Sequence, residues 1–305
     1  REMELEGVKV DEDFKRFYPY SELASKVLGF TGGDNQGIIG LEVKYEEYLK
    51  GKNGTILTTT DARGIELDGV AEDRVEPVAG NTLKISLDAN IQMYAQQMAE
   101  KVMEEKQADK VGILLMNPQN GEILAMVNVP EFDLNDPFTL NVEPQEGTAA
   151  SKQELLNQMW RNPSINDTYE PGSTFKVITA FAPALDTCGA TLGTVYYDAP
   201  YTIGTKTFRN WYSQGYLGYS SIRDGIVYSM NIVAVRCMME TVSPQLGVEY
   251  AENFGITTLT DTDLNPATAL GGLTYGVTNL ELTAAFASIA NGGVYTKPIF
   301  FTRIL

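Results

Sequence analysis

The sequence has 305 residues, 43% hydrophobic and 21% charged, which predicts a folded protein with a substantial core. Its formal net charge of −17 argues against a nucleic-acid partner, because phosphates require a basic surface. The chain contains no histidine, which excludes every mechanism with a histidine base and removes the commonest zinc ligand. Its two cysteines, Cys188 and Cys237, are too few for a disulfide framework, and we interpret both as small apolar residues.

The first 82 residues are rich in charge, glycine and tyrosine, and they carry only short predicted elements. Residues 51–69 alternate apolar and polar side chains around glycine turns, which predicts a β-hairpin. The turn-rich segment 75–82 then precedes an apolar strand. We therefore predict an accessory lobe over residues 1–82 and a larger domain over residues 83–305.

The larger domain begins with strong periodic signals. Residues 88–106 place Ile91, Ala95, Met98 and Val102 at helical spacing, which predicts an amphipathic helix. Residues 111–116 and 122–129 are apolar strands joined by Asn-Pro-Gln-Asn-Gly, a hairpin signal. Because both strands are apolar almost throughout, the sheet should be covered on both faces. This order of elements predicts an α+β fold with an antiparallel sheet flanked by helices.

The later chain alternates loops and helices. Residues 131–170 are predicted to form a long loop that leads into an apolar helix. Near the end, residues 278–290 predict a helix that begins with a capping box of Thr278 and Glu281 and stops at Asn-Gly-Gly. No apolar run reaches the roughly 18–20 residues of a membrane span, and no signal peptide is visible.

The apolar helix starts with a serine and a lysine three residues apart. Ser173 follows Pro-Gly in the first turn, and Lys176 lies one turn further on the same face. The positive end of the helix dipole and the surrounding apolar residues both lower a lysine pKa, so Lys176 could act as a base towards Ser173. The structural alternative is a serine cap with a lysine that extends out of a buried helix.

A second polar pair interrupts a later apolar stretch. Ser229 and Asn231 stand two residues apart between two helical segments, which suggests a hydroxyl and an amide that point into a cleft. The structural alternative is a plain turn between helices that uses two turn-forming residues, and taken alone the pair favours that alternative.

Ser-x-x-Lys followed by Ser-x-Asn is the motif order of penicillin-binding proteins and class A β-lactamases. Residues 159–180 (MWRNPSINDTYEPGSTFKVITA) strongly resemble the active-site segment of penicillin-binding proteins, the peptidoglycan transpeptidases. Residues 111–138 resemble the family's opening hairpin, and residues 270–298 resemble its later helix and turn. The resemblance starts near residue 16, where the chain is similar to the family's pedestal domain.

The resemblance implies the penicillin-binding/serine β-lactamase-like transpeptidase fold and a serine D,D-transpeptidase activity. In that reading, Ser173 attacks the D-Ala-D-Ala bond of a stem peptide or a β-lactam, and Lys176 takes the serine's proton. Ser229 relays a proton to the leaving amine, and Asn231 holds the backbone amide of the substrate.

No metal or organic cofactor is implied by this family chemistry. The expected partners are peptidoglycan stem peptides, β-lactam antibiotics and cell-wall synthesis proteins. The expected location is the outer face of the bacterial cytoplasmic membrane, with an anchor that is not in this sequence.

The family's third motif, Lys-Thr-Gly, does not occur; Lys206-Thr207 is followed by Phe208 and precedes Ser-x-Asn. We therefore expect a transpeptidase domain that stops before that strand and leaves an unpaired sheet edge, as a fragment or a recombined product would. Residues up to about 185 resemble the monofunctional class B proteins, whereas residues from 191 onward look more like class A. A catalytically silent binding module of the same fold is the main alternative, and a β-lactam sensor or β-lactamase is another.

Overall fold

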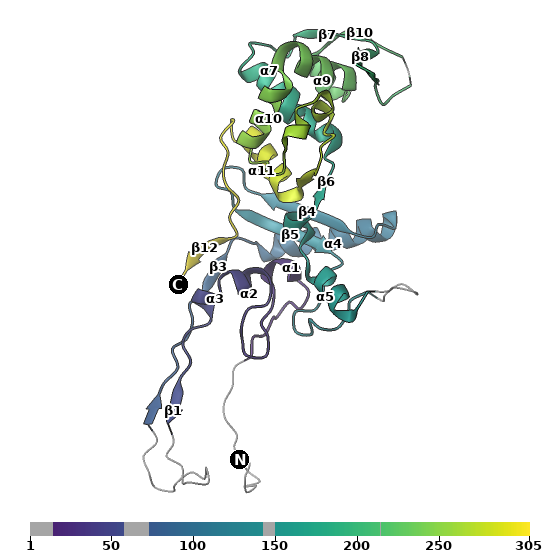
Figure 1. The fold of residues 1–305 in the computed structure, drawn as a ribbon. Helices are drawn as coiled ribbons and strands as arrows, with labels where there is room; N and C mark the ends of the chain where they lie inside the picture. The colour runs from purple at the N-terminus through teal and green to yellow at the C-terminus, as the bar shows by residue number, and fades with distance from the viewer. Residues whose placement is uncertain (1–14, 58–72, 143–149, 214) are drawn as a thin grey trace.

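A computed structural model describes residues 15–57, 73–142, 150–213 and 215–305. The molecule is elongated, with a mainly helical head, a central sheet and a narrow two-stranded ribbon at the far end (Figure 1). The ribbon pairs β1 (Thr55–Leu57) with β2 (Asp73–Val75) in antiparallel register. It confirms the first strand of the hairpin predicted over 51–69, whereas residues 58–72 lie outside the described residues.

The predicted central hairpin is confirmed. Strand β4 (Val111–Met116) pairs antiparallel with β5 (Ile123–Val129). One face of this pair packs on Ala95 and Ala99 of α4 (Ala89–Lys106). The opposite face packs on α1 (Ser25–Leu28) and α11 (Asn279–Ala290), so helices cover both faces as the apolar strands require.

The buried face of α4 differs from the predicted one by one position. Gln92 is 1% exposed, whereas Val102, which the apolar spacing placed in the core, is 42% exposed. The Gln92 amide donates to Met126 O at 3.0 Å and accepts from Met126 N at 2.8 Å, on the edge of β5 that faces away from β4. This polar side chain is therefore buried because its amide makes the two backbone hydrogen bonds that a neighbouring strand would otherwise make.

In the described part of the chain, β4 pairs with β5 alone. The β5 edge is better covered, since Ile123 N donates to Ile299 O at 3.0 Å. That contact lies just before β12 (Phe301–Ile304), which pairs with β3 (Leu83–Ile85) below the sheet.

The prediction of a single long loop over 131–170 is wrong. Helices α5 (Lys152–Trp160) and α6 (Pro163–Asn166) occupy its second half. Ser151 and Glu154 form a capping box at the start of α5, a signal that was present in the sequence but was outweighed by the turn residues around it. Trp160 packs against Phe30 and Phe132, which attaches this segment to the N-terminal lobe.

A buried polar cluster joins the N-terminal lobe to the sheet. The Ser25 hydroxyl donates to the Glu131 carboxylate, and Lys26 Nζ donates to Asn128 O at 2.9 Å and Pro130 O at 2.7 Å. Burial raises the pKa of Glu131 and lowers that of Lys26. Because each group has several hydrogen-bond partners, the cluster fixes the lobe against the sheet without leaving an unpaired polar atom. Two further short helices of the lobe are α2 (Gly40–Lys44) and α3 (Glu46–Leu49).

The head is built around a buried cluster that includes Phe181, Ile222, Val233 and Cys237. Cys237 is fully buried and unpaired, which confirms its predicted role as a small core residue. A short pair of β6 (Thr168–Tyr169) and β11 (Val277–Thr278) lies where the chain passes from the sheet into the head (Figure 1). The other helical elements of the head are η1 (Gly172–Phe175), η2 (Val177–Phe181), α7 (Ala182–Asp186), α8 (Ile222–Val227), α9 (Asn231–Cys237), η3 (Met238–Val242), α10 (Pro244–Asn253), η4 (Asp261–Asp263) and η5 (Pro266–Leu270).

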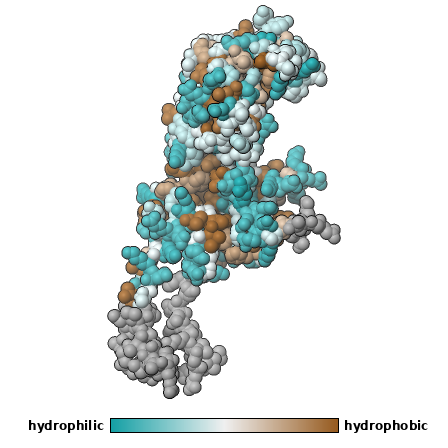
Figure 2. Space-filling model, viewed as in Figure 1, coloured by the Kyte–Doolittle hydropathy of each residue, from teal (hydrophilic) through white to brown (hydrophobic). Residues whose placement is uncertain are grey.

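Two small antiparallel pairs complete the head: β7 (Val195–Asp198) with β10 (Gly218–Ser221), and β8 (Tyr201–Ile203) with β9 (Lys206–Phe208). Figure 2 shows hydrophilic residues spread over both halves of the visible surface, with hydrophobic residues exposed at the waist below the head. None of the described helices combines the length and the hydropathy that crossing a membrane requires.

Candidate active site

Ser173 lies at the start of the predicted helix and is exposed to solvent. The helical run from Gly172 to Asp186 is confirmed, but it begins with a 3₁₀ turn and continues through a π-helical turn before it becomes α-helical. Residues three apart eclipse one another in a 3₁₀ helix, so Ser173 and Lys176 share a face as predicted. Gly172, immediately before the serine, has a φ of +57°, which favours glycine there.

Lys176 is buried, with 2% of its surface exposed. Its Nζ donates to Ser229 O at 2.7 Å, to Ser229 Oγ at 3.0 Å and to Asn231 Oδ1 at 2.7 Å. Burial lowers the pKa of Lys176 from 10.5 to about 8. The amine is therefore held in place by three acceptors and loses its proton far more readily than an exposed lysine does.

Ser229 lies in the turn between α8 and α9, and Asn231 is the first residue of α9, so the pair interrupts the helical stretch as predicted. Ser229 has a φ of +51°, an uncommon conformation for a residue other than glycine, asparagine or aspartate. Met230 between them is fully buried, so its side chain anchors the turn in the core of the head. This backbone conformation aims both the Ser229 carbonyl and its hydroxyl at Lys176.

The structure thus brings three of the four predicted site residues into direct contact. In the described part of the chain, Ser173 Oγ makes no hydrogen bond. Lys176 lies one turn further along the same helical run, but its Nζ donates to Ser229 and Asn231 and not to Ser173. Catalytic hydrogen bonds are often long before substrate binds, so this geometry is compatible with a later contact between the serine and the amine. Among the described residues, no group of three or more acidic, cysteine or histidine side chains could hold a metal ion.

A glycine that no sequence pattern singled out packs directly behind the serine. Gly271 follows η5 with a φ of +75°, and a Cβ added to it would lie 2.2 Å from Gly172 O and 2.6 Å from Gly172 N. The backbone that presents Ser173 is therefore held against a position where only glycine fits.

Gly271→Ala is expected to slow acylation of Ser173 by about 100-fold, because the methyl group must displace the Gly172 backbone and with it the serine. The measurement is the rate of covalent labelling by a fluorescent penicillin. Gly189→Ala is the matched control, since Gly189 has a similar φ of +72° but open space where its Cβ would lie. The control is expected to lose about 1 kcal/mol of stability from backbone strain and to keep its labelling rate. Equal slowing in both variants would contradict a role for the Gly271–Gly172 contact.

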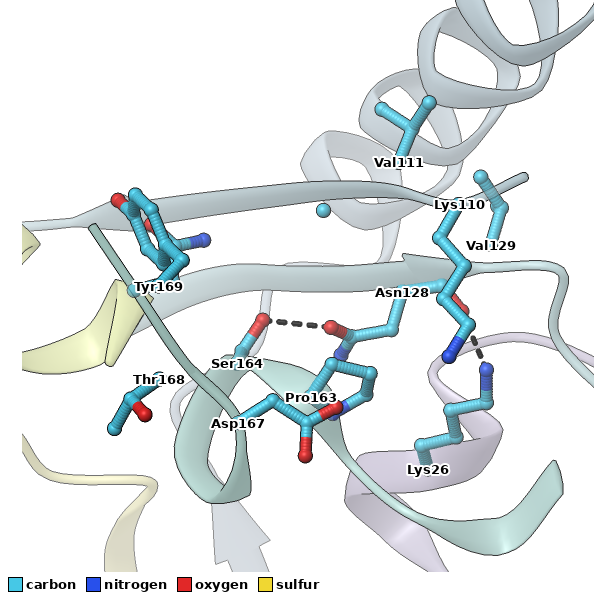
Figure 3. A pocket seen from close by; sticks show the side chains of 12 residues that line it. Lys26, Lys110, Val111, Asn128, Val129, Pro163, Ser164, Asp167, Thr168 and Tyr169 are labelled. Carbon is cyan, nitrogen blue, oxygen red and sulfur yellow. Dashed lines mark hydrogen bonds between the residues drawn. The ribbon is translucent and has the colours of Figure 1, made fainter. Parts of the chain in front are cut away.

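A cavity of about 290 Å³ lies away from these residues, between the sheet and the segment that leads to the serine. Figure 3 shows Ser164 of α6 and Asn128 of β5 facing each other beside it, with Lys26 close to the same strand. Ser164 Oγ donates to Asn128 Oδ1 at 2.6 Å. None of the four predicted site residues lines this cavity, so it is distinct from the Ser173–Lys176 site.

Two family models match this chain. The penicillin-binding protein transpeptidase domain matches residues 111–305, and the penicillin-binding protein dimerisation domain matches residues 1–85. The boundary that the sequence places between residues 82 and 83 stays a prediction.

Among similar proteins, stage V sporulation protein D of Bacillus subtilis is 31% identical and matches 97% of this chain and 46% of its own length. The peptidoglycan D,D-transpeptidase FtsI of Escherichia coli is 26% identical over 100% of this chain and 51% of its own length. The solved complex of Helicobacter pylori penicillin-binding protein PBP2 with MreC superposes with a TM-score of 0.71 at 25% identity, covering 95% of this chain and 60% of that chain.

The chain therefore spans about half the length of the curated relatives it matches. A class A origin of the segment from residue 191 onward stays a prediction. With a dimerisation domain followed by a transpeptidase domain, the chain belongs to the penicillin-binding proteins, on the class B side of that family.

Proposed function

We propose that this chain carries the acylation centre of a peptidoglycan D,D-transpeptidase, with Ser173 as its nucleophile. Lys176 supports this assignment most directly: its amine is buried, has a pKa of about 8 and follows an exposed serine by one turn. An amine with these properties can accept a hydroxyl proton near neutral pH, which a chain without histidine needs. The relatives named as D,D-transpeptidases support the same reaction.

In the proposed reaction, Ser173 Oγ attacks the carbonyl carbon of the penultimate D-Ala while its proton passes to Lys176 Nζ. The C–N bond to the terminal D-Ala then breaks, and Ser229 passes a proton, resupplied by Lys176, to the leaving amine. This leaves an acyl ester on Ser173. The amine of a neighbouring stem peptide then attacks that ester and forms the cross-link, and the proton that this amine loses passes through Lys176 to Ser173 Oγ as the ester bond breaks.

Asn231 is proposed to hold the substrate's backbone amide beside the ester. A β-lactam acylates the same serine by opening its four-membered ring, so no leaving group departs. The Ser173 N–H is one proposed donor to the oxyanion. No cofactor takes part in these steps.

The proposed partners are peptidoglycan stem peptides, β-lactams and cell-wall synthesis proteins. The solved PBP2–MreC complex supports the last class. The proposed location is the outer face of the bacterial cytoplasmic membrane, as the cell-wall substrate requires.

A second candidate is a catalytically silent binding module of the same fold. Lys-Thr-Gly does not occur in these 305 residues, which span about half the length of the curated relatives, so covalent labelling and not this motif distinguishes the two candidates.

The test is incubation with a fluorescent penicillin, followed by denaturing electrophoresis and mass mapping of the labelled peptide. We expect an adduct on Ser173 in the native sequence and none in Ser173→Ala. Thermal unfolding of both proteins shows whether they are folded under the labelling conditions. Folded native protein without an adduct would favour the silent module, and steady hydrolysis of the drug would indicate a β-lactamase.

A further inference from the structure

A loop that carries no catalytic motif, residues 209–211, lies against the Ser229–Asn231 part of the site. The Asn231 amide has two ends, and its Nδ2 donates to Arg209 O at 2.9 Å while its Oδ1 accepts from Lys176 Nζ at 2.7 Å. A side-chain amide can rotate and exchange these two ends. The Arg209 carbonyl accepts only the NH₂ end, so it keeps the oxygen end turned towards the lysine.

The next two residues attach the same loop to the same turn. Asn210 Oδ1 accepts from Ile232 N at 3.2 Å, at the start of α9. Trp211 Nε1 donates to Tyr228 O at 3.2 Å, directly before Ser229. The loop is therefore bonded to the Ser229–Asn231 turn on both sides of the residues that contact Lys176.

The loop is itself fixed by a buried carboxylate. Asp198, at the end of β7, is 1% exposed. Its Oδ1 accepts from Asn210 Nδ2 at 2.7 Å and its Oδ2 accepts from Leu217 N at 2.9 Å. A buried carboxylate is costly without such donors, so Asp198 strongly favours the one loop conformation that supplies both of them.

We infer that Asp198 and Asn210 are positioning residues for the transfer of the Ser173 proton. Asp198 orients Asn210, and Asn210 holds the start of α9 against the loop. The Arg209 carbonyl is thereby placed to orient the Asn231 amide, which in turn fixes the Lys176 amine. This inference rests on the proposed function for its catalytic meaning, but the chain of contacts can be tested without turnover.

The first test is a double-mutant cycle read by the rate of acylation with a fluorescent penicillin. Asn210→Ala is expected to slow acylation by about tenfold. Without Asn210 the Arg209 carbonyl is no longer held in place, so the Asn231 amide that contacts Lys176 is less well oriented. If Asn210 acts through Asn231, then Asn210→Ala/Asn231→Ala will be no slower than Asn231→Ala alone. Multiplicative slowing, or a rate equal to that of the native protein in Asn210→Ala, would overturn the inference.

Asn135→Ala is the matched control. Asn135 also bridges two chain segments, with Oδ1 accepting from Tyr18 N at 3.0 Å and Nδ2 donating to Tyr18 O at 2.9 Å, but it lies in the lower half of the molecule. It is expected to change thermal stability and not the acylation rate. Asp198→Asn keeps the shape of the side chain and serves as the second variant should Asn210→Ala fail to fold; its acylation should be slowed in the same direction.

The second test follows the protonation of Lys176 by NMR in protein with isotope-labelled lysine, with Lys176→Met to assign the signal. In Asn210→Ala, water should reach the amine and move its titration midpoint upward, towards that of an exposed lysine. An unchanged midpoint would overturn the inference, because it would show that the contacts of Asn210 do not affect the surroundings of the Lys176 amine. This test remains valid even if the native chain forms no penicillin adduct, which would instead contradict the proposed function.

Discussion

Lys176→Met is expected to slow acylation of Ser173 by about 1,000-fold and to leave the fold intact. A positioned general base typically contributes a factor of 10²–10⁴ to a rate. No histidine exists to replace it, because the chain contains none. Methionine matches the length and apolar stem of lysine, so the buried volume stays filled. The measurement is the second-order rate of labelling by a fluorescent penicillin, with thermal unfolding as the check on folding.

Lys176→Arg tests whether the site needs the basicity of Lys176 or only its positive charge. Arginine keeps a positive charge and several donors, but it does not lose its proton in proteins. We therefore expect Lys176→Arg to be about as slow as Lys176→Met. A rate close to that of the native protein would show that the site needs a cation and not a base.

Lys26→Met is a matched control for removing a buried lysine. Lys26 is 7% exposed and donates to two backbone carbonyls, but it belongs to the polar cluster below the head. Its loss is expected to reduce stability by about 1–3 kcal/mol, because buried acceptors lose their donor. The labelling rate of this variant should not change, and a large loss of rate would indicate that the lower half of the molecule affects the site.

Much of the fold could be predicted from local signals. The β4–β5 hairpin has a clear turn and two apolar strands, and α11 has a capping box and a glycine stop; the structure contains both. The prediction of which α4 residues are buried was wrong at Gln92, because its burial depends on hydrogen bonds to a strand edge. The spacing of apolar residues carries no information about such bonds. Helix α5 was missed because its capping box stands among turn-forming residues.

The site could be predicted only in part. Ser173 and Lys176 are close in sequence, and Ser229 and Asn231 form a second short motif, so pattern and family resemblance find both pairs. Contacts made by backbone atoms leave no such pattern. The Arg209 carbonyl and the close approach of Gly271 to Gly172 depend on tertiary structure, and nothing in their local sequence distinguishes them from ordinary loop residues.

Acylation should depend on pH with a midpoint of about 8, the lowered pKa of Lys176. Only the neutral amine can accept the serine proton, so the rate rises with pH up to this midpoint and is constant above it. At pH 7 about a tenth of the molecules carry the neutral amine, and each further unit of acidity lowers the rate about tenfold. A lysine with the ordinary pKa of 10.5 would give a rate that still rises steeply above pH 9.

The lowered pKa of Lys176 also determines how the free energy of unfolding changes with pH. Measuring that change therefore tests the pKa independently of acylation. Between about pH 8 and 10.5 the unfolded chain binds a proton at this lysine that the folded protein has released. The Lys176 contribution to the free energy of unfolding therefore rises with pH across that window, and Lys176→Met should abolish this contribution. Urea unfolding of the native protein and the variant at several pH values measures the difference. A pH-independent difference, together with an acylation rate that does not change between pH 6 and 9, would contradict the assignment of Lys176 as the base that activates Ser173.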